Sequence, residues 1–298
     1  MNRTIRPFIT LLASIVLLVS NELLAHPGSG IVVDRQGNVY FVDTGSGIWR
    51  IDPKGELTRL SGPAYHWMAI DHQGLLKNVT LPYFSSDDAT VARVGENLLV
   101  SSDFPVTVGR DGSLYYPWHP DSERWQVFRL APSGTTAVLK PLPAHIGRRS
   151  LRWVNGIASA SDGSLYYTED NAVRKISARG ELTTVVENMT VTDCSSVPGV
   201  EPELKPYFRG LDVDSAGTVY VAAAGCGAVL KIKPEGTSAV VLRAQSPWSP
   251  TGIAVSGGNV YVLEYLHTAN DNRREWIPRV RKLSPDGRVA TLATINRR

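Results

Sequence analysis

The chain has 298 residues, of which 43% are hydrophobic and 20% are charged, and its formal net charge is +3. This balance is that of an ordinary globular protein with one large domain or two small ones. The charge is too small to favour nucleic acid as a partner, and no run of basic residues is long enough to change that expectation.

The N-terminus has the layout of a secretory signal peptide. Arg3 and Arg6 precede an uncharged run from Pro7 to Ser20, and Ala25 is the candidate cleavage residue. The apolar run is short for a membrane span. We therefore predict a signal peptide over 1–25 and an exported protein, periplasmic or secreted, that leaves the membrane after cleavage. An uncleaved N-terminal anchor is the alternative.

The region 208–242 contains four short runs of alternating apolar residues, each closed by a turn rich in Gly, Pro or Asp. Such a pattern predicts a four-stranded antiparallel meander. A single meander cannot bury both of its faces, so it needs neighbours of the same kind. The chain repeats the unit in approximate ranges that we take as blades: 28–61, 65–103, 104–143, 154–188, 208–244 and 250–295.

The range 65–103 is the poorest copy of the repeat. We expect its first strand at Trp67–Asp71, a weak second strand at Leu75–Leu81, and the third and fourth strands at Thr90–Val94 and Asn97–Ser101. With this copy counted, 26–298 is predicted to be one all-β domain, a six-bladed β-propeller of four-stranded antiparallel blades. A solenoid of stacked meanders is the alternative, but neither end of the repeat array reads as a polar cap.

The repeat motif now allows a comparison with known families. Its form, G-[IL]-x-V-D-x-x-G-x-[VL]-Y in the first half and [RK]-[IL]-x-P-x-G in the second, resembles NHL repeats and the SMP-30/gluconolactonase superfamily of six-bladed propellers. The resemblance spans nearly all of the chain after 26. It implies the fold more strongly than the function, because this scaffold hosts lactonases, strictosidine-synthase-like enzymes and pure binding modules.

One stretch resembles the metal-binding motif of the lactonases in that superfamily. Val154–Ala158 looks like their P-N-G-[IL]-A, whose Asn binds a divalent cation, which makes Asn155 a weak candidate ligand. Arg209 stands where that family has an aspartate, and Gly28-Ser29 stand where it has a glutamate. Because Ca²⁺ requires several anionic or carbonyl oxygens, we expect no cofactor. Ca²⁺ in an altered site, or a metal held by Asp43, Glu169 and Glu264, is the alternative.

The predicted topology divides the loops between two faces. Links between first and second strands, and between third and fourth strands, are tight turns on one face. The opposite face carries the long insertions, and we expect the functional site there. Cys194 and Cys226 both fall on this long-loop face, and export permits their oxidation. We predict a disulfide between them, with two free buried thiols as the alternative.

Residues that open the innermost strands should line the mouth of the central channel, and residues that end the second strands should form the next ring outward. The first set is Ser29, His66, Phe104, Asn155, Arg209 and Thr251, and the second is Asp43, Trp118, Glu169, Ala223 and Glu264, with Ser102 or Asp103 in the poorest blade. These sets predict a polar ligand site. Its candidate residues are His66, Asn155, Arg209, Asp43, Glu169 and Glu264, joined by the loop residues Trp153 and Trp248. The alternative is structural: each side chain satisfies a strand end, or Arg209 pairs with Glu169 or Glu264.

The leading functional hypothesis is a monomeric, exported propeller that binds a small-molecule or peptide-like ligand on its long-loop face. Trp and Arg residues in the long loops fit a sugar or an anionic ligand. Two enzymes are the alternatives. One is a gluconolactonase-type hydrolase with an altered metal site, which is the favoured reaction if the chain is an enzyme. The other is a strictosidine-synthase-like enzyme with Glu264 as general base.

Overall fold

The computed structural model describes residues 27–60, 65–76, 89–118, 125–141, 154–169, 171–194, 197, 205–267 and 276–296. Within these ranges the chain forms β-strands and one short 3-10 helix, η2 (Ala224–Cys226). The predicted signal peptide at 1–25 and the candidate Trp153 lie outside the described residues.

Six antiparallel sheets form the blades: in five of them four strands follow one another in chain order, and the described part of the sheet of blade 2 has three strands. Blades 1 and 2 contain β1 (Ile31–Val33), β2 (Val39–Asp43), β3 (Gly47–Ile51) and β4 (Leu57–Arg59), then β5 (Trp67–Asp71), β6 (Ala89–Val94) and β7 (Asn97–Ser102). Blades 3 and 4 contain β8 (Thr107–Val108), β9 (Leu114–Trp118), β10 (Gln126–Leu130) and β11 (Thr136–Pro141), then β12 (Gly156–Ser159), β13 (Leu165–Thr168), β14 (Val173–Ile176) and β15 (Leu182–Val186). Blades 5 and 6 contain β16 (Phe208–Val213), β17 (Val219–Ala223), β18 (Ala228–Ile232) and β19 (Ser238–Arg243), then β20 (Trp248–Ser256), β21 (Asn259–Leu266), β22 (Pro278–Leu283) and β23 (Val289–Thr294).

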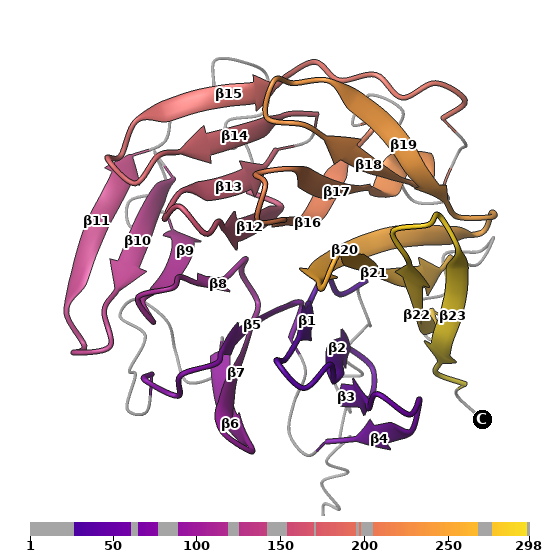
Figure 1. Ribbon diagram of the computed structural model, residues 1–298, viewed down its shortest axis with the longest axis horizontal. Coiled ribbons are helices and arrows are strands. Elements are labelled where there is room, and N and C mark those ends of the chain that lie inside the picture. Colours follow the sequence, from indigo (N-terminus) through magenta and orange to yellow (C-terminus); the bar gives the residue numbers. More distant parts are fainter. Residues whose placement is uncertain are drawn as a thin grey trace, which may run out of the picture.

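The first strands of the blades surround a common centre. Strands β1, β5, β8, β12, β16 and β20 contact one another in that order, and β20 also contacts β1. Figure 1 shows these strands in the middle of the molecule, with β4, β11, β15, β19 and β23 at its rim. The six-bladed propeller predicted from the repeat is therefore confirmed.

The ring closes without an exchange of strands, because blade 1 comes entirely from the N-terminal part and blade 6 from the C-terminal part. The Tyr265 hydroxyl donates to the Val42 carbonyl at 2.9 Å, and the Thr251 hydroxyl donates to the Gly28 carbonyl at 2.6 Å. Tyr265 and Trp276 also pack in one hydrophobic cluster with residues of blade 1. Packing and two buried hydrogen bonds thus join the first and last blades.

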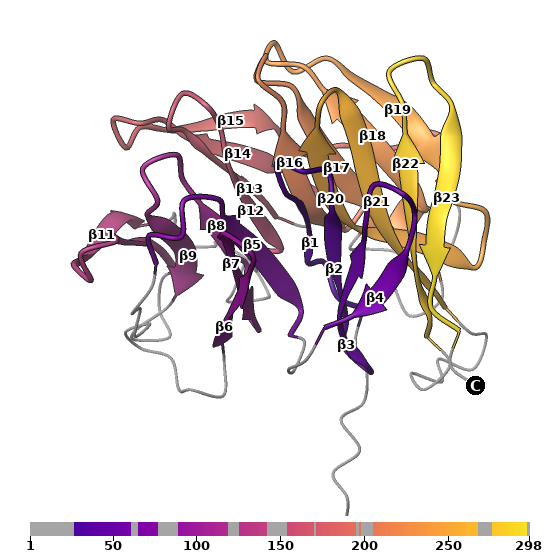
Figure 2. The same ribbon diagram turned by 60° about the horizontal axis from the view of Figure 1, so that its bottom comes forward.

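The predicted tight turns have a common mechanism that the Asp34 turn illustrates. The Asp34 carboxylate accepts hydrogen bonds from the backbone N–H groups of Gln36 at 3.0 Å and Asn38 at 2.8 Å. Gly37 has φ 85, a left-handed conformation that favours glycine. In Figure 2 the turns that join β18 to β19 and β22 to β23 lie on the same side of the molecule, as the predicted division of loops requires.

In blade 2 the predicted strands at 67–71, 90–94 and 97–101 are confirmed, but their predicted order in the sheet is wrong. The described order of this sheet is β5-β7-β6, so 97–102 lies beside the innermost strand and 89–94 lies outside it. Residues 75–76 are not in a strand, and 77–88 lie outside the described residues. The burial pattern explains the order: every residue of β7 is buried, as a middle strand requires, whereas β6 alternates between half-buried and exposed positions.

A glycine near the start of the innermost strand allows neighbouring blades to approach closely. This position carries Gly30, Gly156, Gly210 and Gly252 in blades 1, 4, 5 and 6. A Cβ atom at Gly252 would lie 2.3 Å from the carbonyl oxygen of Ser29, and one at Gly210 would lie 2.8 Å from the Cα atom of Gly252. Glycine is therefore required by backbone-to-backbone contact between blades.

Replacing Gly252 by Ala is expected to destabilise the ring where its two ends meet. The added methyl group must displace the Ser29 backbone, and such overpacking costs about 1 to 3 kcal/mol. Urea unfolding of wild type and Gly252→Ala would measure this loss. An unchanged midpoint would show that the two blades are not in close contact here.

Candidate functional site

The starts of the innermost strands enclose a pocket on the long-loop face, which we call the mouth pocket. It has a volume of about 230 Å³. Its lining residues are Trp67, Asp103, Phe104, Pro105, Trp125, Val154, Asn155, Tyr207 and Arg209. Asn155 and Arg209 were predicted to line the channel mouth together, and the structure places both in this one pocket.

Arg209 is half-buried at the start of β16, and its guanidinium is poorly compensated. Its hydrogen bond within the described residues goes to the carbonyl oxygen of Pro27, at 2.7 Å. The predicted alternative partners, Glu169 and Glu264, are occupied by other arginines. Burial lowers the pKa of Arg209 below its usual range. A guanidinium has five N–H donors, so most of the donors of Arg209 remain available to a ligand.

A hydrogen bond between a histidine and a carboxylate lies beside this guanidinium pocket. His66 Nδ1 and Asp103 Oδ1 are 2.7 Å apart, with side-chain exposures of 24% and 46%. Asp103 itself lines the mouth pocket, and His66 is joined to the pocket through Asp103. The pocket therefore presents a cationic group and an acceptor group to the same space, which suits a ligand with both an anionic group and a hydrogen-bond donor.

Aromatic side chains form much of the remaining wall. Trp67, Phe104 and Trp125 come from three different segments of blades 2 and 3. The Trp67 indole N–H donates to the backbone carbonyl of Asn155 at 3.2 Å. Because β5 and β12 belong to blades that are not neighbours, Trp67 must extend across the channel. Trp67 was not predicted to line the site, because the sequence pattern indicated only that it belongs to a strand.

The predicted disulfide between Cys194 and Cys226 is confirmed, with a Cα–Cα distance of 4.4 Å. Cys226 belongs to η2, and the N–H of Ala224 in the same helix donates to the Tyr207 carbonyl at 3.1 Å. Tyr207 lines the mouth pocket with φ 50, a left-handed conformation that is rare for a large side chain. The disulfide therefore anchors the short helix that holds Tyr207, two residues before Arg209.

The predicted outer carboxylates are each bound within their own blade. Glu264 is fully buried and accepts from Arg279 Nε at 2.5 Å and from Arg281 Nε at 3.0 Å. Glu169 pairs with Arg174 Nε at 3.3 Å. Asp43 accepts from the Gly45 backbone N–H at 3.2 Å and from the Ser46 hydroxyl. None of the three lines the mouth pocket, and the general-base hypothesis for Glu264 stays a prediction.

The other predicted mouth and loop residues lie in different surroundings. Trp248 stacks on Arg279, whose guanidinium carbon lies 3.9 Å from the centre of the ring. Phe104 lines the mouth pocket as expected, and Trp118 ends β9 half-buried. Thr251 is used in ring closure, and Ser29 is 6% exposed in the wall of the central channel.

The mouth pocket does not fit a divalent cation. Asn155, the candidate ligand, shares the pocket with the Arg209 guanidinium, which would repel a cation. Among the described residues, no three His, Cys, Asp or Glu side chains are grouped closely enough to hold a metal ion. The proposed trio of Asp43, Glu169 and Glu264 is accordingly not brought together. We derive no reaction step through a metal at this site.

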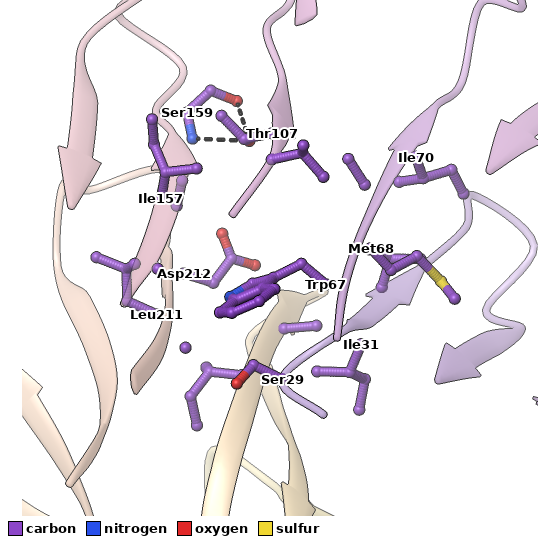
Figure 3. Close-up of a pocket in the computed structure, with 18 of the residues that line it drawn as sticks. Ser29, Ile31, Trp67, Met68, Ile70, Thr107, Ile157, Ser159, Leu211 and Asp212 are labelled. Carbon is purple, nitrogen blue, oxygen red and sulfur yellow. Dashed lines mark hydrogen bonds between the residues drawn. The ribbon is translucent and has the colours of Figure 1, made fainter. Parts of the chain in front are cut away.

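A second cavity occupies the central channel, and we call it the channel cavity. It has a volume of about 200 Å³ and is lined by the innermost strands of all six blades. Trp67 lines both cavities, so its side chain separates the mouth pocket from the channel cavity. Figure 3 shows the Trp67 ring crossing the cavity between Ser29 and Asp212.

Trp67 lies four residues before Asp71, as Gly30 lies four residues before Asp34, so blade 2 has tryptophan where four other blades have glycine.

Comparison with known proteins shows the fold class. No protein-family model matches the chain, and no curated protein matches it in sequence. A luciferin-regenerating enzyme is similar in structure, with a TM-score of 0.53 and 14% identity over 87% of this chain and 92% of that one. An inactive virginiamycin B lyase from Staphylococcus aureus, solved with quinupristin, has a TM-score of 0.50 and 15% identity over 92% of this chain and 85% of that one. A calcium-binding regucalcin from Agrobacterium tumefaciens has a TM-score of 0.49 and 14% identity over 79% of this chain and 81% of that one.

The chain is therefore a six-bladed β-propeller. The fold that the predicted resemblance implied, a six-bladed propeller, is confirmed. Because these identities are low, the similarity does not show which substrate or metal this chain binds or which reaction it catalyses. Within the described residues, no helix has the length and hydropathy that crossing a bilayer would require.

Proposed function

We propose that this propeller is a binding protein whose mouth pocket takes a small carboxylate with an aromatic or apolar body, such as an N-acylated amino acid or the end of a short peptide. Arg209 is the observation on which the proposal rests. It is a half-buried guanidinium in an aromatic-walled pocket, and its hydrogen-bond partner among the described residues is a backbone carbonyl. Arg binds carboxylates through two parallel hydrogen bonds, so it is suited to this role.

The other walls of the pocket match the remaining parts of such a ligand. Trp67, Phe104 and Trp125 supply flat apolar surface for an aromatic or branched side chain. Asp103 supplies an acceptor for an amide N–H, and its pairing with His66 fixes its position. A ligand with its carboxylate on Arg209 and its amide toward Asp103 would use both polar groups at once.

The proposal predicts that Arg209→Gln loses affinity for N-acetylphenylalanine, measured by isothermal titration calorimetry. A charge-assisted hydrogen bond contributes about 1.5 to 3 kcal/mol, which corresponds to a loss of about 10- to 150-fold. Arg209→Lys retains the charge without the planar fork and is expected to bind with intermediate affinity.

Arg288→Gln is the matched control, because it removes the same charge from an exposed turn, where Arg288 pairs with Asp286. It is expected to bind like wild type. The amine benzylamine, which has a similar ring and the opposite charge, is expected not to compete. Equal affinity of Arg209→Gln and wild type, with both folded by circular dichroism, would overturn the proposal.

A further inference from the structure

The channel cavity lies behind Trp67 and differs in chemistry from the mouth pocket. Most of its lining consists of Ile, Val, Leu, Met and Ala side chains from the innermost strands. Among the described residues that line it, Asp212 and His72 are the titratable ones, and none is Lys or Arg. Since a water molecule takes about 30 Å³ of liquid volume, a cavity of about 200 Å³ can hold an ion of several heavy atoms.

Asp212 gives this cavity a negative charge. Its Oδ1 accepts the backbone N–H of Val213 at 2.8 Å, and its Oδ2 accepts the backbone N–H of Val255 at 2.7 Å. Figure 3 shows the carboxylate pointing into the cavity. A carboxylate has about four acceptor positions, and the two hydrogen bonds leave the others directed to the cavity. No cationic side chain among the described residues pairs with Asp212.

Blade 3 shows that an uncharged side chain can make the hydrogen bond that Asp212 makes to the backbone of the neighbouring blade. Thr107 occupies the equivalent position there, and its hydroxyl accepts the backbone N–H of Ser159 at 3.2 Å, as Asp212 accepts that of Val255. A neutral threonine can therefore cap the exposed edge of the next innermost strand. Burial raises the pKa of Asp212 to about 6, so the ionised carboxylate is poorly compensated by the protein itself.

The surroundings of Asp212 favour an organic cation over a divalent metal. Ca²⁺ takes six to eight oxygen ligands. Among the described residues that line the cavity, the side-chain oxygens besides the Asp212 carboxylate are three hydroxyls from separate blades: Ser29, Thr107 and Ser159. The buried hydroxyl of Ser29 has no hydrogen-bond partner within the described residues. Trp67 adds an aromatic wall that attracts ammonium groups.

We propose that the channel cavity is a second binding site, separate from the mouth pocket, for a small alkylammonium ion whose charged nitrogen binds the Asp212 carboxylate. Its alkyl part lies against the Ile and Val side chains of the innermost strands. The cavity shares Ile70, His72 and Val108 with another cavity toward the turn face, which offers an entry route. Arg35 and Arg110 line that outer cavity, but both are exposed and therefore screened by solvent.

The test is a titration of the folded protein with ethylammonium chloride at neutral pH, followed by thermal melting and by calorimetry. Sodium chloride at the same ionic strength corrects for salt. We expect saturable binding of one ion per chain and a rise in melting temperature that sodium does not reproduce. We expect Asp212→Thr, which copies blade 3, to lose both effects, and Asp212→Asn serves as a second variant if the first does not fold.

Two control variants distinguish ethylammonium bound at Asp212 from ethylammonium bound elsewhere on the protein. Asp286→Asn removes the same charge from an exposed turn and is expected to bind ethylammonium like wild type. Arg209→Gln is expected to bind it unchanged, so failure of the mouth-pocket proposal leaves this one intact. Absence of saturable binding to wild type, equal binding by a folded Asp212 variant, or an Asp212-dependent effect of Ca²⁺ instead of ethylammonium would overturn the proposal.

Discussion

Replacing Glu264 by Ala is expected to lower the free energy of unfolding by about 3 to 5 kcal/mol, the usual loss when one partner of a buried ion pair is removed. Glu264 is completely buried, and Arg279 and Arg281 both donate to its carboxylate with side-chain exposures of 16% and 14%. Without Glu264, two guanidinium groups would remain largely buried without their anion. Urea unfolding, followed by tryptophan fluorescence, would measure the loss.

Glu235→Ala is the matched control, because Glu235 is exposed and lies 3.8 Å from the exposed Lys233. Its unfolding midpoint is expected to match that of wild type. Glu264→Gln retains the shape of the side chain and one acceptor, so we expect it to be less destabilising than Glu264→Ala. A Glu264→Ala protein as stable as the Glu235→Ala control would contradict a structural role and reopen a functional one.

Removing the disulfide by the double substitution Cys194→Ser and Cys226→Ser is expected to cost about 3 to 4 kcal/mol, by the chain-entropy relation for a loop of this size. The two cysteines are 32 residues apart. The disulfide also anchors η2, whose Ala224 N–H binds the Tyr207 carbonyl beside the mouth pocket. We therefore expect weaker binding of N-acetylphenylalanine as well as lower stability.

Reduction provides an independent form of the same experiment. Dithiothreitol is expected to lower the unfolding midpoint of wild type toward that of the double variant and to leave the double variant unchanged. Ligand affinity should fall in parallel, because Tyr207 and Arg209 are close in sequence. Loss of stability with full retention of affinity would show that the disulfide does not position the pocket.

The sequence pattern was a good guide to the fold because its turns recur in phase. An Asp or Pro before a Gly with positive φ marks the end of a short strand whatever lies around it, as at Asp34–Gly37. The order of strands in blade 2 was not predictable in the same way. Alternation in the sequence shows that a strand is half-buried but not which strand lies beside it. In the structure, the continuous burial of Asn97–Ser102 marks this strand as a middle strand.

The grouping of residues in the mouth pocket was predictable only in part. Asn155 and Arg209 open equivalent strands of successive blades, so the repeat itself places them at one mouth. The structural alternative, in which Arg209 pairs with Glu169 or Glu264, is wrong. The arginines that bind these two carboxylates lie on the adjacent strand of the same blade. Trp67 was missed, although it occupies the position that is glycine in four blades, and that departure from the repeat was its signal.

The most direct measurement of the central claim is a crystal structure of the protein soaked with 4-bromophenylacetate, in which anomalous scattering locates the bromine. The account predicts a bromine peak among Trp67, Phe104 and Trp125, with the carboxylate bound to the Arg209 guanidinium. It also predicts no such peak in crystals of Arg209→Gln. A mouth pocket that stays empty while bromine binds elsewhere, or binding that persists in Arg209→Gln, would contradict the account.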